Sequence, residues 1–96
     1  MVEIIDEDGH IVTEKTVDFK AGDTLYDVLD RHFNLKVSGS EHDTFGRILL
    51  GIDVIETDFQ TRFIYIEIDG EEARKGIDYL PLQDGSTYRF SVRQPH

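Results

Sequence analysis

The chain of 96 residues contains no cysteine. It therefore has no disulfide, no thiolate nucleophile, no zinc site built from thiolates and no iron–sulfur cluster. It also lacks any run of about 18 apolar residues, so the sequence predicts no membrane span. Residues 1–4 lack the basic and apolar blocks of a signal peptide. These absences exclude several kinds of site but do not mark a cellular compartment.

Basic residues are scarce, with 10 lysines and arginines against 20 aspartates and glutamates and a formal net charge of −10. Phosphate binding relies on clustered basic side chains, so this charge argues against nucleic acid and against anionic lipid surfaces. The imbalance is strongest in residues 1–30, where nine carboxylates accompany two lysines. We interpret this region as a solvated surface that keeps a small monomer soluble, in preference to an acidic docking patch.

Turn residues and alternating apolar positions predict a β-hairpin at the start of the chain. Its strands are expected over residues 2–5 and 11–19, because Ile11 and Val17 share one parity of an extended chain. The link contains Asp8-Gly9, a pair that tolerates the positive φ of a tight turn.

An amphipathic helix is predicted over about residues 24–34. Its apolar stripe recurs at intervals of three and four residues and consists of Leu25, Val28, Leu29, His32 and Phe33. Thr24 and Asp27 have the spacing of a capping box, which marks the helix start.

Three further strands are predicted in the rest of the chain. Residues 34–46 are expected to form a polar loop, and residues 48–55 a nearly continuous apolar strand. Gly51 inside that strand indicates a bulge or a close backbone approach. Residues 63–68 and 87–93 alternate apolar and polar side chains, as half-buried strands do.

This order of elements predicts one α+β domain over residues 1–96. A helix that follows a hairpin must cross the sheet and pack its apolar stripe on one face. The expected architecture is a β-grasp, or ubiquitin-like, fold with one helix on a mixed sheet.

Four segments resemble the DUF4430 family, which is similar to the C-terminal β-grasp domain of the transcobalamin and intrinsic-factor proteins. They are residues 46–53, 63–70, 76–79 and 82–90. The likeness covers about residues 17–93, with Phe63 where the family often has tryptophan. It implies a secreted or surface-attached bacterial module. A corrinoid-like ligand is implied by the resemblance alone, and no other cofactor is expected.

Other functions of this fold lack the residues they require. A ubiquitin-like sulfur carrier needs a Gly-Gly C-terminus, and a ferredoxin needs four cysteines. The chain carries no serine elbow and no glycine loop typical of a phosphate site. His32 has no identifiable nucleophile or paired acid, so we expect a boundary histidine and no enzyme.

Two segments offer oxygen and nitrogen ligands for a metal ion. Residues 6–9, Asp-Glu-Asp-Gly, resemble a calcium loop faintly, but the glutamate that an EF-hand requires at position twelve is replaced by Val17. A plain hairpin turn is therefore favoured there. Glu41, His42 and Asp43 suit zinc or a similar ion, but three adjacent residues converge poorly, and solvated loop polarity is favoured.

A set of aromatic and basic residues suggests a ligand-binding platform on the sheet. Phe63 and Tyr65 lie opposite the isoleucine face of their strand, and Arg89 has the outer parity of the last strand. Tyr79 is a loop aromatic that could join them. The competing interpretation is ordinary cross-strand pairing.

The sequence thus predicts a non-enzymatic module that binds a small ligand or a protein partner at an extracellular bacterial surface. The alternatives are a structural spacer of a larger surface protein, or a domain with a metal-binding loop. A ligand that binds the folded state would raise the thermal stability, and a spacer would show no such rise.

Overall fold

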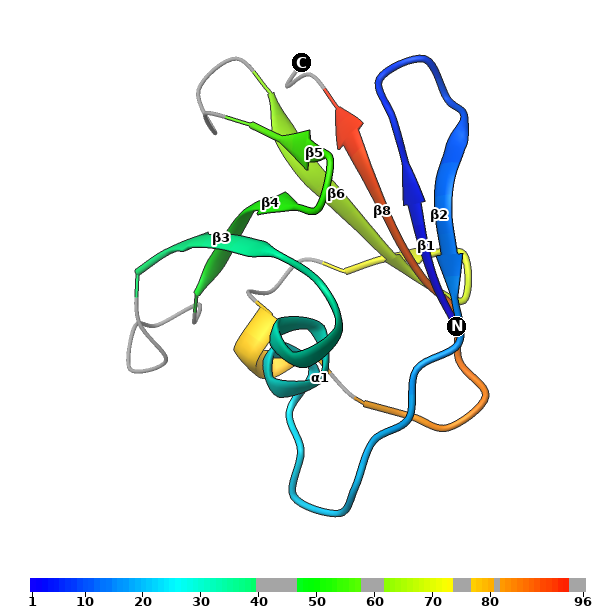
Figure 1. Ribbon diagram of the computed structural model, residues 1–96, viewed down its shortest axis with the longest axis vertical. Coiled ribbons are helices and arrows are strands. Elements are labelled where there is room, and N and C mark those ends of the chain that lie inside the picture. Colours follow the sequence, from blue (N-terminus) through cyan, green and yellow to red (C-terminus); the bar gives the residue numbers. More distant parts are fainter. Residues whose placement is uncertain (40–46, 58–61, 74–76, 81, 94–96) are drawn as a thin grey trace.

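Two β-sheets and one α-helix make up the described part of the chain (Figure 1). The computed structural model describes residues 1–39, 47–57, 62–73, 77–80 and 82–93. None of the helical residues among these forms a segment long and apolar enough to cross a membrane. The architecture is α+β, as predicted.

The larger sheet has five strands in the order β2-β1-β8-β6-β7. Their bounds are β1 Val2–Ile5, β2 Ile11–Lys15, β6 Phe63–Ile68, β7 Glu71–Glu72 and β8 Tyr88–Arg93. The first strand and the last lie side by side and parallel at the centre, while the other pairs are antiparallel. The sheet is therefore mixed, as the sequence predicted.

The predicted N-terminal hairpin is present as β1 and β2, but its second strand is shorter than expected. β2 ends at Lys15, and the prediction that it continues to residue 19 is wrong. The prediction that Ile11 faces the core is also wrong, because its side chain is 52% exposed. The pairing register shifts between Ile4 and Ile5, and this bulge breaks the simple alternation of faces.

The predicted helix is α1, Leu25–His32, with Thr24 as its N-cap. The capping box is confirmed: the Asp27 backbone N–H donates to the Thr24 hydroxyl at 3.1 Å. In return the Thr24 N–H donates to the Asp27 carboxylate at 3.0 Å. The predicted stripe is buried at its apolar positions, Leu25, Val28, Leu29 and Phe33.

A second sheet of three strands, in the order β3-β4-β5, corrects two predictions. β3, Leu35–Ser38, occupies part of the segment expected as a loop. The single strand expected over 48–55 is divided into β4, Ile48–Ile52, and β5, Ile55–Glu56. Asp53 turns the chain between them with a positive φ of 51°. The Asn34 backbone stabilises that turn, donating to the Asp53 carboxylate at 2.9 Å and accepting from the Asp53 N–H at 2.8 Å.

The close backbone approach predicted at Gly51 is present. A Cβ on this residue would lie 3.1 Å from the Ile55 carbonyl oxygen of the neighbouring strand. Any larger residue would therefore force β4 and β5 apart, which explains a glycine inside an apolar strand.

One apolar core joins the two sheets and the helical segments. Its buried members come from both sheets, from α1 and from the short 3₁₀ helix η1, Ile77–Tyr79. The large sheet contributes Val2, Ile4, Ile64, Ile66, Tyr88 and Phe90. Helix α1, η1 and the small sheet thus lie on one side of the large sheet, which we call its inner face. The described elements leave the opposite, outer face uncovered.

Candidate functional site

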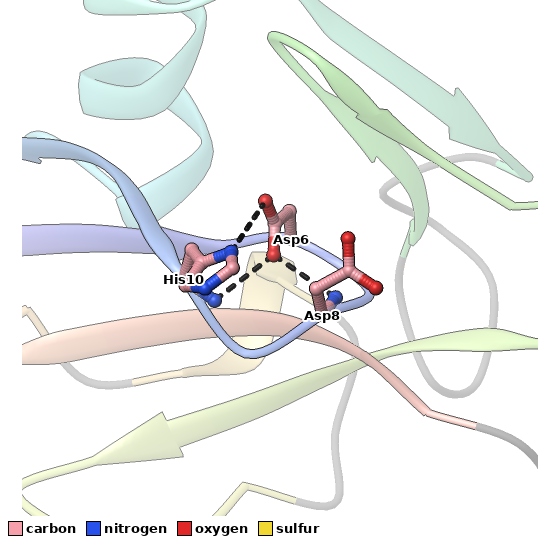
Figure 2. Close-up of side chains that lie close together, drawn as sticks. All are labelled: Asp6, Asp8 and His10. Carbon is pink, nitrogen blue, oxygen red and sulfur yellow. Dashed lines mark hydrogen bonds and ion pairs between the residues drawn. The ribbon is translucent and has the colours of Figure 1, made fainter.

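Three side chains that can ligate a metal converge at the turn between β1 and β2 (Figure 2). Asp6 lies directly after β1, and His10 directly before β2. Asp8 lies between them, followed by Gly9, whose φ of 86° allows the chain to reverse. The hairpin therefore brings together residues at positions i, i+2 and i+4.

Backbone hydrogen bonds hold this turn in shape. The Asp6 N–H donates to the His10 carbonyl at 2.9 Å, and the Gly9 N–H donates to the Asp6 carbonyl at 3.1 Å. One carboxylate oxygen of Asp6, Oδ1, accepts from the N–H groups of Asp8 at 3.0 Å and His10 at 2.9 Å. The other, Oδ2, lies 3.8 Å from His10 Nδ1. The turn thus fixes Asp6 while leaving one of its oxygens directed at the imidazole.

The spacing of the ligand atoms suits a small divalent ion after a modest contraction. One ligand atom from each of the three residues lies within 4.8 Å of the others. Donors that bind one tetrahedral ion at about 2.1 Å lie about 3.4 Å apart. Asp8 and His10 are exposed, so rotation of their side chains can supply the difference. Two carboxylates and an imidazole suit zinc or a similar transition ion, with water completing the coordination.

The surroundings of the turn are open to solvent. The His10 side chain is 78% exposed and that of Asp6 31%. The neighbouring Glu7 forms an ion pair with Arg62 and so turns away from the three potential ligands. An ion would exchange readily with water here, and it would bind more weakly than in a closed structural site. Sequence reasoning found the turn but not the ligand set, because His10, at position five of a calcium loop that starts at Asp6, offers an imidazole nitrogen where such a loop needs an oxygen ligand.

The predicted aromatic platform is assembled in part on the outer face. The rings of Phe63 and Tyr65 lie 6.3 Å apart at an interplanar angle of 60°. The cation over the Tyr65 ring is Arg93, with its guanidinium carbon 4.3 Å from the ring centroid. Arg89 instead lies 3.4 Å from the Glu3 carboxylate. In the pairing of β6 with β8, Arg89 lies opposite Glu67 and Arg93 lies opposite Phe63. This register explains why Arg93, and not Arg89, lies over the Tyr65 ring.

Tyr79 lies away from that platform. It belongs to η1, which contacts α1 on the inner side of the large sheet, while Phe63 and Tyr65 face outward. The predicted metal-binding segment Glu41, His42 and Asp43 lies outside the described residues. His32 is half-buried at the end of α1.

The structure reveals one polar cluster that sequence reasoning missed, formed by Tyr26, Arg47 and Asp78. The Arg47 guanidinium donates to Asp78 at 2.6 Å and at 3.0 Å, and its carbon lies 3.4 Å from the centre of the Tyr26 ring. The Arg47 N–H also donates to Asp78, at 2.7 Å. The side-chain hydrogen bond from Arg47 is the main cause that lowers the pKa of Asp78. These residues come from α1, from the start of β4 and from η1, so the cluster ties three elements together.

A solved protein structure has a fold similar to that of this chain. No family model matches the chain, and no curated protein matches it. A similar solved structure is the 1.30 Å crystal structure of a "putative metal binding protein" from Ruminococcus gnavus. The TM-score is 0.73 at 16% identity, over 99% of this chain and 95% of the other. At this identity the likeness establishes a shared fold and nothing more.

Proposed function

We propose that this chain is a non-enzymatic binding domain that takes up a divalent metal ion at the β1–β2 turn. The observation that carries the proposal is the convergence of Asp6, Asp8 and His10. The metal binding attributed to the R. gnavus protein of similar fold supports it. Asp6 would act as the fixed ligand, because its turn hydrogen bonds hold it in place. Asp8 and His10 would close on the ion from the solvent side.

The fold in this proposal is a β-grasp. The supporting observations are the N-terminal hairpin, the parallel central pair β1 and β8, and the helix on the inner face. The resemblance to DUF4430 likewise remains a hypothesis, and with it a secreted or surface-attached location in a bacterium. The complete reading frame of the gene tests the location, since a secretion or sorting signal outside these residues would support it and a cytoplasmic gene product would contradict it.

Calorimetric titration with Zn²⁺ tests the metal site directly. We expect one ion to bind per chain, and binding to fall at least about tenfold in His10→Ala and in Asp8→Asn, since each removes one of three ligands. Asp84→Asn is the matched control, because Asp84 is also an exposed turn aspartate followed by a glycine of positive φ. It should bind zinc like the wild type.

Three outcomes would contradict the proposal. An equal loss of zinc affinity in Asp8→Asn and Asp84→Asn would mean that binding depends on the overall negative charge and not on the turn. Loss in His42→Ala, with none in His10→Ala, would move the site to residues 41–43. A chain that binds no zinc, manganese or calcium at all would favour the structural spacer.

A further inference from the structure

The outer face of the large sheet carries a row of charged side chains that crosses all five strands. The pairing register places Glu14 opposite Glu3, Glu3 beside Arg89, Arg89 opposite Glu67, and Glu67 opposite Glu72. Directly paired residues share a face of the sheet, so all five side chains lie on the outer face. Four carboxylates therefore accompany one guanidinium within the row, and a second guanidinium, of Arg93, lies 3.9 Å from the Glu67 carboxylate on the same face. The row keeps an excess of negative charge after these two ion pairs.

Next to this row, the same face is apolar. The neighbouring cross-strand row consists of Ile5, Ser91 and Tyr65. Phe63 lies two residues before Tyr65 on β6 and faces the same way. At the edge of the sheet, Ile11 and Val12 of β2 are 52% and 43% exposed. Isolated apolar residues on a surface are common, but here they adjoin one another across neighbouring strands.

Ser91, in the middle of the row with Ile5 and Tyr65, has a hydroxyl without a hydrogen-bond partner. Its side chain faces outward, since Tyr88 and Phe90 of the same strand alternate into the core. The residue is only 6% exposed, and its hydroxyl is the sole buried side-chain polar atom without a partner in the described residues. A buried hydroxyl left unpaired carries a desolvation cost, which a partner on this face could remove only by displacing the side chains that cover Ser91.

The acidic row borders a hollow of about 430 Å³. Its lining includes the carboxylates of Glu3, Glu67 and Asp69 together with Arg89. Arg89 is already 3.4 Å from Glu3, which shows that a guanidinium fits among these carboxylates. A lysine or arginine side chain from another molecule would meet the same kind of environment beside it.

We propose that the outer face of the large sheet docks a segment of a partner protein in which lysine or arginine alternates with apolar residues. Basic side chains would meet the carboxylates of the row, and apolar ones would pack on Ile5 and Ile11, beside the Tyr65 ring that Arg93 covers. A second copy of this chain is the poorer occupant, because two such rows placed face to face would repel each other. This docking surface is separate from the metal-binding turn and does not depend on it.

A defined peptide tests the proposal on the ¹⁵N-labelled domain by NMR. The probe is an eight-residue peptide that alternates lysine and leucine. The control peptide has the same length and alternates glutamate and leucine. With the lysine peptide we expect amide shifts to concentrate on β1, β8 and β6. Replacing two carboxylates, Glu3→Gln with Glu67→Gln, should weaken binding about fivefold, as expected for two partly screened charge pairs.

The matched control removes two acidic charges elsewhere, by Asp18→Asn with Asp30→Asn. Both residues are exposed and lie on or beside the helix, away from the outer face. This variant should lose less than about twofold, because only long-range attraction changes. Equal losses in the two variants, or shifts that avoid the outer face, would overturn the proposal. So would equal binding of the glutamate peptide, or a dimer of the free chain whose interface is this face.

Discussion

Two polar clusters of this domain contain similar groups in opposite surroundings. In the cluster of Tyr26, Arg47 and Asp78, the Arg47 and Asp78 side chains are only 19% and 8% exposed, and they pair with each other. At the β1–β2 turn, Asp8 and His10 are exposed, and each has a ligand atom within 4.8 Å of one from Asp6. The first arrangement has satisfied its charges internally and therefore stabilises the fold. The second has retained ligand atoms that can bind something else.

The largest expected effect is on stability, from Asp78→Asn. The change leaves the Arg47 guanidinium largely buried without its counter-charge, and breaking such a pair costs about 3 kcal/mol of unfolding free energy. Urea denaturation measures it. Asp8→Asn at the exposed turn should change stability by less than about 0.5 kcal/mol. Equal effects would contradict the division of roles between the two clusters.

Arg47→Lys should have a smaller effect, of about 1.5 kcal/mol. The ammonium keeps the charge but loses both the bidentate pairing with Asp78 and the flat stacking on Tyr26. Tyr26→Leu separates the two losses, because it removes only the stacking surface. If Arg47→Lys unfolds at the same urea concentration as the wild type, charge alone accounts for the stability that the cluster contributes.

Acid should weaken the buried cluster in a defined pH window. The pKa of Asp78 is lowered from its ordinary 3.8, chiefly by the hydrogen bond from Arg47. A carboxylate whose folded pKa is depressed contributes stability that is present above its unfolded pKa. That contribution is lost as the pH falls from about 3.8 through the folded value. Stability measured from pH 6 to pH 2 should therefore fall less steeply in Asp78→Asn than in the wild type.

The smallest effect is expected from metal at the turn. Zn²⁺ at ten times its dissociation constant should raise the unfolding free energy by about 1.4 kcal/mol, because it binds only the folded turn. At the same zinc concentration the rise should fall to about 0.4 kcal/mol or less in His10→Ala and persist in Arg47→Lys. If zinc protects both variants alike, it binds somewhere other than the turn.

Local chemistry explains which parts of the fold could be predicted from the sequence. The capping pair Thr24 and Asp27 and the helix stripe depend on spacing along one element, and both are present. The turn at Asp8-Gly9 depends on a positive φ that glycine adopts without strain. Such features need no distant partner.

The wrong predictions concern segments whose state depends on a partner strand. β3 is only four residues long, so its alternating Leu35 and Val37 give too short a pattern to predict a strand, and its pairing with β4 makes it one. Ile11 is apolar and alternates correctly, yet the shifted register next to Ile5 exposes it. Composition also indicated only a solvated acidic surface, whereas the register collects several of those carboxylates into one row.

The candidate sites also combine features that local sequence shows with features that depend on strand pairing. The aromatic parity of Phe63 and Tyr65 could be found from alternation, but the cation that joins them is Arg93, because β8 pairs antiparallel with β6. Tyr79 could not be placed without knowing that η1 packs beside α1. Asp6, Asp8 and His10 share one spacing along the sequence, but only the closed hairpin shows that the His10 imidazole lies 3.8 Å from the Asp6 carboxylate.

The sequence by itself determined the α+β class, the hairpin, the capped helix and the absence of thiol chemistry. Each of these depends on residue type or on short-range spacing, which the chain carries without folding. Only the tertiary structure decided the second sheet, the pairing of Arg47 with Asp78 and the acidic row on the outer face. These unite residues up to 86 positions apart, as Glu3 and Arg89 are, so they depend on strand order and register. No local pattern encodes that information, because it is set by which strands become neighbours.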